Sequence, residues 1–229
     1  DFKVTIENIA EAKSYSASGA FNTPVGATAP APIFPGEAYE VSFSAAPGSK
    51  LSFATMFVQS NDLFYAPDGE GIDLYDSMGD QIVGDITSQI MLWDAGSEVN
   101  QEPGLGSDQA PRQAGANTGA VDSDNTVRLA TDDFSNLPAV SDVVKVTLSS
   151  TGDTGFTLRV ENVSSSATLM TSDGNSHAVP LAPGVYVIHS GSDVLFDAGM
   201  MDYGYGLANI AEDGDPSGLA TMLATDTGV

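Results

Sequence analysis

The chain contains no cysteine, so it can form neither disulfide bonds nor thiolate metal sites. It has only two histidines, which makes a zinc centre hard to build. No apolar run approaches the roughly 18 residues that a membrane-spanning helix requires. Basic residues are scarce as well, seven against 31 acidic ones, and the formal net charge is -24. A charge of this sign repels nucleic acid and anionic lipid, so we expect no nucleic-acid partner, and docking to a membrane is not favoured.

The length and apolar content of the chain are sufficient for a folded core. It has 229 residues, of which 41% are hydrophobic, and this suits one large all-β domain or two small ones. We expect a single domain over residues 1–229. The sequence opens at Asp1 directly into a strand-like segment, without a basic or apolar leader. We therefore expect a secreted or cell-surface protein whose signal peptide has been removed.

Short apolar stretches rich in β-branched and aromatic residues alternate with connectors rich in Gly, Pro, Ser and Asp. This pattern is typical of an antiparallel β-sandwich with long loops. The predicted strands are Phe2 to Ile9, Tyr39 to Ser44, Leu51 to Val58, Gln89 to Trp93, Val143 to Ser149, Phe156 to Val163, Gly184 to Ser190 and Val194 to Phe196.

Two short helices are predicted beside the strands. The first spans Ile72 to Val83, where apolar residues recur at helical spacing, although Gly79 weakens it by about 1 kcal/mol. The second lies near the C-terminus, at about residues 216–224. Asp215 is placed to cap it, and Pro216 suits its first position.

Two segments share the pattern Phe-x-apolar-x-apolar-Glu-Asn-apolar, Phe2 to Ile9 and Phe156 to Val163. We interpret them as equivalent strands of one sandwich rather than as two domains, because no linker-like change of composition separates them. The stretch from Gly96 to Asn136 is long, polar and almost without strand signals. A connection of this length in a compact domain usually carries function or wraps the surface.

The most informative motif lies where that long stretch begins. The only tryptophan, Trp93, precedes Asp94, and Glu98 follows four residues later across a glycine. Upstream, Asp62 also ends an apolar run, so the two loops could meet at one end of a sheet. Calcium takes six to eight oxygen ligands from flexible loops, which makes Asp62, Asp94 and Glu98 candidate ligands. Further oxygens could come from Asn61, Asn100 or Glu102.

Other interpretations of this motif stay open. Magnesium would use fewer protein ligands and more water. The spacing alone favours a strand that ends in a simple turn at the Trp-Asp-Ala-Gly sequence.

Catalytic arrangements are hard to assemble from this sequence. A Ser-His-Asp site would need His177 or His189, but no Gly-x-Ser-x-Gly elbow is present, and His189 lies in an apolar stretch typical of a structural histidine. Phosphate-binding loops are absent. We therefore predict that the protein is not an enzyme. Asn162, Val163 and Ser164 match the pattern for N-glycosylation, a short pattern that often occurs by chance.

Taken together, several stretches resemble the spondin N-terminal domain family, and specifically its cysteine-free bacterial members. The matching segments cover nearly the whole chain: residues 2–9, 53–62, 93–98, 109–113, 195–199 and 211–216. The resemblance implies an eight-stranded antiparallel sandwich, a C2-like variant, that carries one calcium ion between loops at one end. The calcium-binding aspartates of the family fall on Asp62 and Asp94.

The third acidic ligand of the family falls on Glu98, where the animal domain has aspartate. The animal domain also has cysteines that this chain lacks, and a proline where Asn61 stands. With these departures, the resemblance still implies an exported calcium-binding protein that acts in cell adhesion or in extracellular matrix or surface assembly. The alternative is a structural subunit of a homopolymeric filament or surface layer. The expected partners are calcium and either further copies of the chain or components of the cell surface or matrix.

Overall fold

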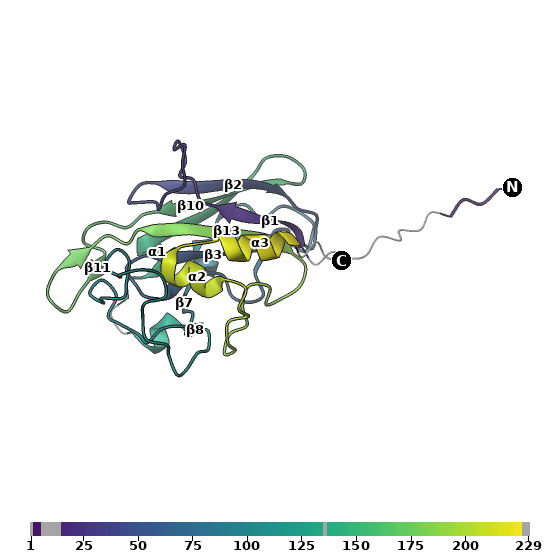
Figure 1. The fold of residues 1–229 in the computed structure, drawn as a ribbon. Helices are drawn as coiled ribbons and strands as arrows, with labels where there is room; N and C mark the ends of the chain where they lie inside the picture. Colours follow the sequence, from purple (N-terminus) through teal and green to yellow (C-terminus); the bar gives the residue numbers. More distant parts are fainter. Residues whose placement is uncertain (1, 6–14, 135–136, 226–229) are drawn as a thin grey trace.

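A computed structural model describes residues 2–5, 15–134 and 137–225, and these residues form a mostly antiparallel β-structure (Figure 1). Of the thirteen strands in this part of the chain, eight have four or more residues: β1 (Tyr15–Phe21), β2 (Ala38–Ser44), β3 (Lys50–Phe57), β4 (Leu63–Ala66), β7 (Met91–Asp94), β9 (Val144–Ser150), β10 (Gly155–Asn162) and β13 (Leu181–His189). The others are two-residue strands: β5 (Ile72–Asp73), β6 (Gly84–Asp85), β8 (Arg128–Leu129), β11 (Leu169–Met170) and β12 (Ser176–His177). The predicted all-β sandwich class is confirmed.

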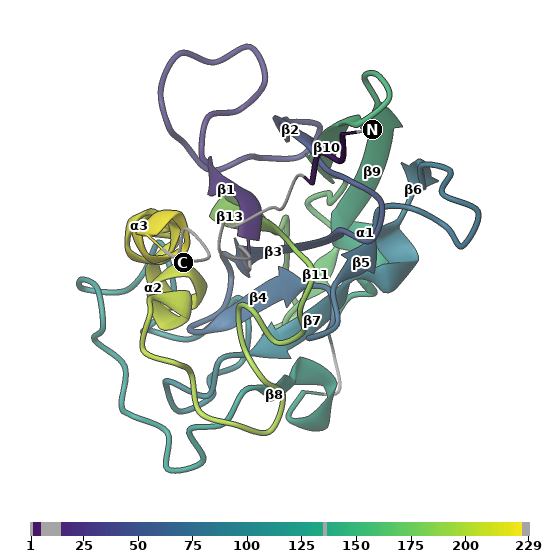
Figure 2. The same cartoon turned by 90° about the vertical axis from the view of Figure 1, so that its right-hand side faces the viewer.

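The strands form two main sheets that pack on each other. The larger one has the order β1-β13-β3-β4-β7-β8, with β5 also paired to β3, and the smaller one has the order β2-β10-β9-β6. A separate hairpin joins β11 to β12. Every strand pair is antiparallel, and Figure 2 shows β9 and β10 on one side of the large sheet and α2 (Leu207–Asp213) and α3 (Ser217–Thr225) on the other.

Because helices cover its outer face, the large sheet is buried on both sides. Side chains alternate along a strand, so Leu63 and Tyr65 of β4 enter the core between the sheets, whereas Phe64 enters a second core beneath the helices. Strand β3 behaves in the same way, with Phe53 in the first core and Ala54 in the second. Each fully buried aromatic ring contributes about 1.5 to 3 kcal/mol through the apolar surface it removes from water. The centre of the large sheet is therefore the best-protected part of the fold.

The two C-terminal helices are short and firmly bounded. Helix α2 ends at Gly214, whose backbone is left-handed (φ 66°), a conformation that glycine adopts without a Cβ clash. The Asp215 carboxylate then accepts a hydrogen bond from the Ser217 amide and caps α3, so the predicted C-terminal helix and its cap are confirmed. None of the helices in the described part of the chain has the length and apolar character needed to cross a membrane. The remaining helical segments are α1 (Val140–Val143), η1 (Thr87–Gln89) and η2 (Ala130–Asp132).

Several sequence predictions were wrong. Phe2 to Thr5 form no strand, and Phe2 and Val4 are exposed because no described strand pairs with them; the rest of that predicted strand, Ile6 to Ile9, lies outside the described residues. The predicted helix from Ile72 to Val83 is absent, since Ile72 pairs with Leu51 of β3 and Gly79 turns the chain with φ 87°. Val194 to Phe196 are not a strand either, although Phe196 is buried.

The remaining strand predictions agree with the structure to within a few residues, although the one from Gln89 begins as η1 and becomes β7 at Met91. Among the longer elements, strands β1 and β4 and helix α2 were missed. Residues 96–134 contain only β8 and η2 as regular elements, which fits the prediction of a long, nearly strandless connection.

Asn162, at the end of β10, is a polar group on which the two sheets depend. Its amide donates to the carbonyl oxygens of Ile33 (3.0 Å) and Val179 (2.9 Å), and its oxygen accepts from the amide (3.0 Å) and hydroxyl (2.7 Å) of Ser164. The side chain is fully buried. It therefore satisfies backbone groups that water cannot reach.

We expect Asn162→Ala to lower the free energy of unfolding by about 3 to 4 kcal/mol, because buried backbone carbonyls lose their donors. Urea denaturation followed by tryptophan fluorescence measures the change. The matched control is Asn175→Ala, since Asn175 is exposed and bonds only within its own turn, and its effect should stay below about 1 kcal/mol. Equal losses for the two variants would contradict the role given to Asn162.

Candidate metal centre

The pairing of β4 with β7 brings Asp62 next to Asp94. These strands are antiparallel, with Leu63 opposite Asp94 and Phe64 opposite Trp93. Asp62 directly precedes β4 and Asp94 ends β7, so the start of one strand meets the end of the other, and the Ala95 amide donates to the Asp62 carbonyl oxygen (3.0 Å). The expectation that these two loops meet at one end of a sheet is therefore met.

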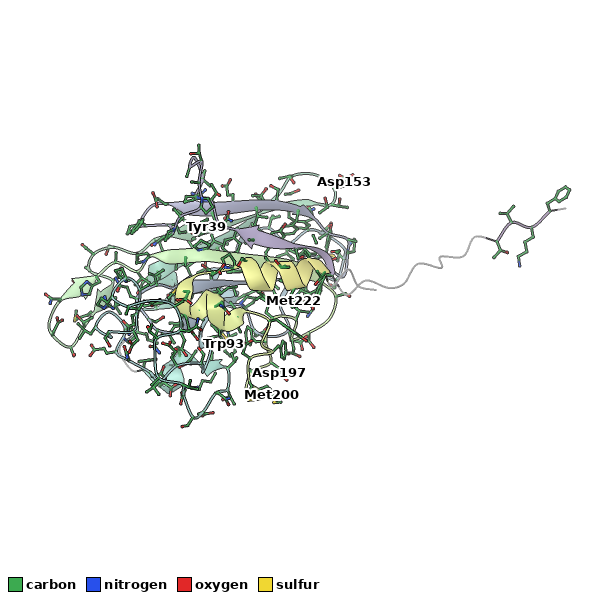
Figure 3. All side chains as sticks on the ribbon, in the orientation of Figure 1. Tyr39, Trp93, Asp153, Asp197, Met200 and Met222 are labelled. Atoms are coloured by element: carbon green, nitrogen blue, oxygen red, sulfur yellow. The ribbon has the colours of Figure 1, made fainter. Side chains whose placement is uncertain are left out.

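Trp93, labelled in Figure 3, fixes the end of β7. Its side chain is buried, its indole N–H donates to the carbonyl oxygen of Ala66 (3.3 Å), and its ring meets Phe196 edge-on at 5.0 Å between centroids. Phe64 contacts the same ring of Phe196 (5.4 Å). The acidic loop thus leaves the sheet from a rigid aromatic cluster.

Asp62 is fully buried, and its two carboxylate oxygens differ in their surroundings. Oδ2 accepts hydrogen bonds from the backbone amides of Ser97 and Glu98 (both 3.0 Å) and from the Ser97 hydroxyl (3.3 Å). Oδ1 is buried and has no hydrogen-bond partner. An unpaired buried carboxylate oxygen is costly, so a ligand such as a cation or a proton at Oδ1 would relieve the cost.

Asp94 is also fully buried, and it has a cationic neighbour. Its Oδ1 accepts from the Gly96 amide (2.6 Å), and its Oδ2 lies 3.3 Å from the guanidinium of Arg128. Arg128 is shared, because it also binds Asp122 (2.9 Å) and Asp133 (2.6 Å). The Arg128 to Asp94 contact lacks hydrogen-bond geometry, so Oδ2 of Asp94 keeps capacity for another partner.

Glu98 is buried, and its charge acts on Asp62. Its Oε1 accepts from the Gly119 amide (2.8 Å), and the absence of a side chain at Gly119 makes room for the whole carboxylate, which a Cβ there would overlap. Within residues 2–5, 15–134 and 137–225, no three acidic or histidine side chains are arranged as a metal-binding group. The structure thus brings Asp62 and Asp94 together, whereas the Glu98 carboxylate is bonded to Gly119.

The three additional candidates differ from one another. The side-chain oxygen of Asn100 is buried without a partner, so it is available at the site. The oxygen of Asn61 accepts from the Gln101 amide (3.3 Å), and its nitrogen donates to the Val99 carbonyl oxygen (3.2 Å). Both Glu102 oxygens bind Ser172 (2.6 Å each), in the loop between β11 and β12. Of the three, Asn100 fits a cation best.

Two further residues belong to this site and were missed from the sequence. Arg128 and Glu212 contact it from β8 and α2, far along the chain. The weak signal for Glu212 was its position beside the apolar residues Leu207, Ile210 and Ala211, but that stripe indicates burial only if the segment is recognised as a helix.

The buried carboxylates hold their protons unusually strongly. Burial, reinforced by the negative charge of Asp94, raises the pKa of Asp62 to about 8, although the Glu98 and Ser97 amides oppose the shift. Burial also raises the pKa of Asp94, against the Gly96 amide, the Asn100 side chain and Arg128. Ionisation of both carboxylates would therefore create more negative charge than the surroundings balance, and a divalent cation would offset it.

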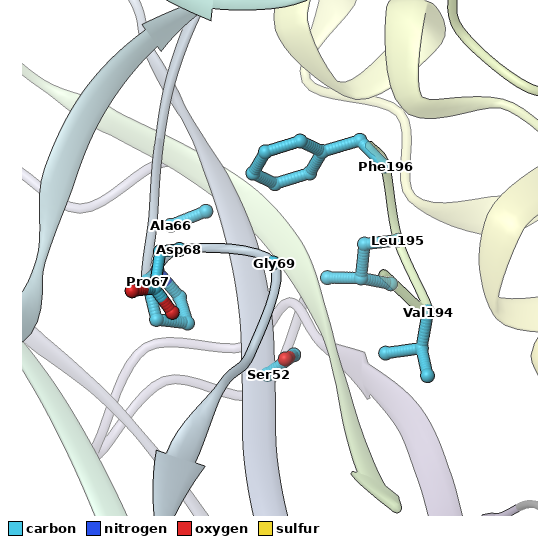
Figure 4. Close-up of a pocket in the computed structure, with 8 residues that line it drawn as sticks. All are labelled: Ser52, Ala66, Pro67, Asp68, Gly69, Val194, Leu195 and Phe196. Carbon is cyan, nitrogen blue, oxygen red and sulfur yellow. The ribbon is translucent and has the colours of Figure 1, made fainter. Parts of the chain in front are cut away.

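A second polar cluster was weighed as a catalytic alternative. His189 Nδ1 lies 2.8 Å from the Gly191 carbonyl oxygen, which can only accept, so Nε2 accepts from the Ser52 hydroxyl (2.9 Å). Both side chains are buried, and Gly71 packs against them. Figure 4 shows Ser52 in the adjoining hollow between Ala66 to Gly69 and Val194 to Phe196, which has about 0 Å³ of space for water. This geometry favours the structural histidine over a nucleophile.

In the presence of a chelator, we expect the free energy of unfolding to fall as the pH rises from about 4 to about 8. Asp62 has its ordinary pKa of 3.8 when unfolded and a pKa of about 8 when folded, so in this range the folded chain binds more protons. Asp62→Asn should remove this part of the slope. His189, whose pKa is lowered by burial, adds a slope of opposite sign in both proteins and cancels in the difference. Urea denaturation across this pH range measures the effect. Plots of unfolding free energy against pH that run parallel for the wild type and Asp62→Asn would contradict it.

Gly96 determines the path of the acidic loop. Its backbone is left-handed (φ 67°), and a Cβ there would lie 2.5 Å from the Thr126 carbonyl oxygen. We expect Gly96→Ala to cost about 3 kcal/mol, from the backbone conformation and from this clash together. Gly79→Ala is the control, since Gly79 has φ 87° but open space around it, and it should cost only about 1 to 2 kcal/mol. Chemical denaturation measures both variants. Similar losses of unfolding free energy would show that the groups around residue 96 move aside for the added Cβ at little cost.

Comparison of the chain with protein-family models, with curated proteins and with solved structures gave no match. The resemblance to the spondin domain therefore stays a prediction from the sequence motifs. What the site does has to be inferred from its own geometry.

Proposed function

We propose that the chain is an exported, calcium-binding β-sandwich in which Asp62 and Asp94 hold the ion and Glu98 completes the acidic set. The observation that carries the proposal is Oδ1 of Asp62, a fully buried carboxylate oxygen without a partner, beside a second buried carboxylate. Oxygen donors are what calcium prefers, and the Asn100 oxygen is a further unpaired donor next to Asp94.

Calcium suits this site better than magnesium or zinc. The available donors are carboxylates and an amide oxygen on loops, and calcium accepts irregular sets of six to eight oxygens at about 2.3 to 2.6 Å. Magnesium demands a tighter octahedron and keeps several waters, for which a buried site has little room. Zinc would need histidine or cysteine, and neither stands among the residues named for this site.

The ion would act here as a structural clamp. Asp62 lies on the β4 side and Asp94 to Glu98 lie on the β7 side, so one ion joins the start of one strand to the loop after the other. Glu98 would have to leave the Gly119 amide to bind it. A loop held in this way can present a fixed surface, which supports a role in adhesion or in matrix or surface assembly.

The alternative function, a subunit of a homopolymeric filament or surface layer, stays a prediction. Strand β2 pairs only with β10 among the described strands, so it is the edge through which such an assembly could extend the smaller sheet.

We expect millimolar calcium to raise the melting temperature of the wild-type chain above its value in excess chelator, because the ion binds only the folded site. Asp62→Asn and Asp94→Ala should each abolish the rise. The matched control is Asp142→Asn, which removes an exposed carboxylate at α1 and should keep the full response. Differential scanning calorimetry measures all four proteins. A wild-type melting curve that does not change between calcium and chelator would refute calcium binding.

A further inference from the structure

Helix α2 contributes a buried carboxylate to the same corner of the molecule as Asp62 and Asp94. Glu212, at the end of that helix, is only 5% exposed, and its Oε2 is buried without a hydrogen-bond partner. Leu207, Ile210 and Ala211 of the same helix belong to the core beneath the large sheet, so Glu212 lies beside that core. Its Oε2 therefore needs a partner that the described residues do not provide.

Ser97 connects Glu212 to the candidate metal centre. The Ser97 hydroxyl lies 3.3 Å from Oδ2 of Asp62, and it also forms a hydrogen bond with the side chain of Glu212. A hydroxyl has one hydrogen, so it can donate to only one of these two carboxylates at a time. Oδ1 of Asp62 and Oε2 of Glu212 are both unpaired, on two carboxylates that contact the same small side chain.

The excess of carboxylates over cationic groups around the site also favours a bound cation. Glu212 senses the negative charges of Glu98, Asp213 and Asp202. Asp62 senses those of Asp94 and Glu98, so several carboxylates gather here. Against them, Arg128 supplies one guanidinium, which it shares with carboxylates outside the group. A divalent cation between the unpaired oxygens would remove most of this excess.

We propose that Glu212 is a ligand of the cation bound by Asp62 and Asp94, so that the ion joins helix α2 to the sheet. The inference rests on the proposed calcium site and adds a ligand from the helix layer to it. Helix α2 continues through Gly214 and Asp215 into α3, which packs on β1 and β13. Figure 1 shows the two helices lying together across the large sheet, so a cation at Glu212 would hold this helix pair in place.

Terbium luminescence tests the inference, because terbium replaces calcium at oxygen sites and Trp93, adjacent to Asp94, would sensitise it. Titration of the full chain gives the affinity, and lifetimes in light and heavy water give the number of bound waters. For Glu212→Gln we expect about ten-fold or more weaker binding and about one additional bound water. Glu212→Asp keeps the negative charge, but its side chain is one methylene shorter and its carboxylate lies farther from the ion. This variant should therefore bind terbium more weakly as well.

The control variant is Asp142→Asn. Asp142 is an exposed carboxylate at α1 and is not among the charged groups that act on Glu212. Its replacement should leave terbium affinity within about two-fold of wild type. Near-ultraviolet circular dichroism in chelator should show that each variant keeps the native fold, since loss of an unpaired buried charge does not destabilise the metal-free state.

The outcomes separate the two proposals. Wild-type affinity and an unchanged water count in Glu212→Gln would overturn the role of Glu212 while leaving the calcium site intact. Weaker binding in Glu212→Gln with full affinity in Glu212→Asp would also overturn it, because the charge would then act at a distance. A wild-type chain that binds neither terbium nor calcium would refute the proposed function itself.

Discussion

The candidate site depends on the hydrogen bonds that one oxygen of Asp62 accepts from the backbone amides of Ser97 and Glu98. These hydrogen bonds tie the loop after β7 to the residue before β4. A neutral acceptor could receive them as well as a carboxylate does. The remaining oxygen is therefore surplus to the fold, and its burial without a partner is a cost. Unfavourable features of this kind occur mainly at functional sites, where a bound ligand offsets their free energy.

This cost is high because of where the residue lies. In many sandwiches one face of each sheet meets water. Here α2 and α3 cover the outer face of the large sheet, and the start of β4 has protein on both sides. A carboxylate on a loop at the rim of an open sheet would be hydrated and would have an ordinary pKa. The same carboxylate beneath a helix layer takes up a proton or a cation.

The sequence was sufficient to predict the local part of this arrangement. Alternation of apolar residues located β2, β3, β9, β10 and β13, and the placement of Asp62 and Asp94 at the ends of apolar runs predicted that their loops would meet. It could not place Arg128 or Glu212, because their contacts depend on β8 and α2, and those are set by long-range packing. It also failed for Ile72 to Val83, where helical spacing was outweighed by pairing with β3 and by a left-handed glycine.

The burial of Asn162 has a consequence for covalent modification. Asn162, Val163 and Ser164 match the glycosylation pattern, yet both ends of the Asn162 amide are bonded inside the protein, and Ser164 Oγ is one of its partners. A sugar attached there would remove a donor from the core and would have no space. The motif could be modified only on an unfolded chain, and such a chain would then be unable to close its two sheets.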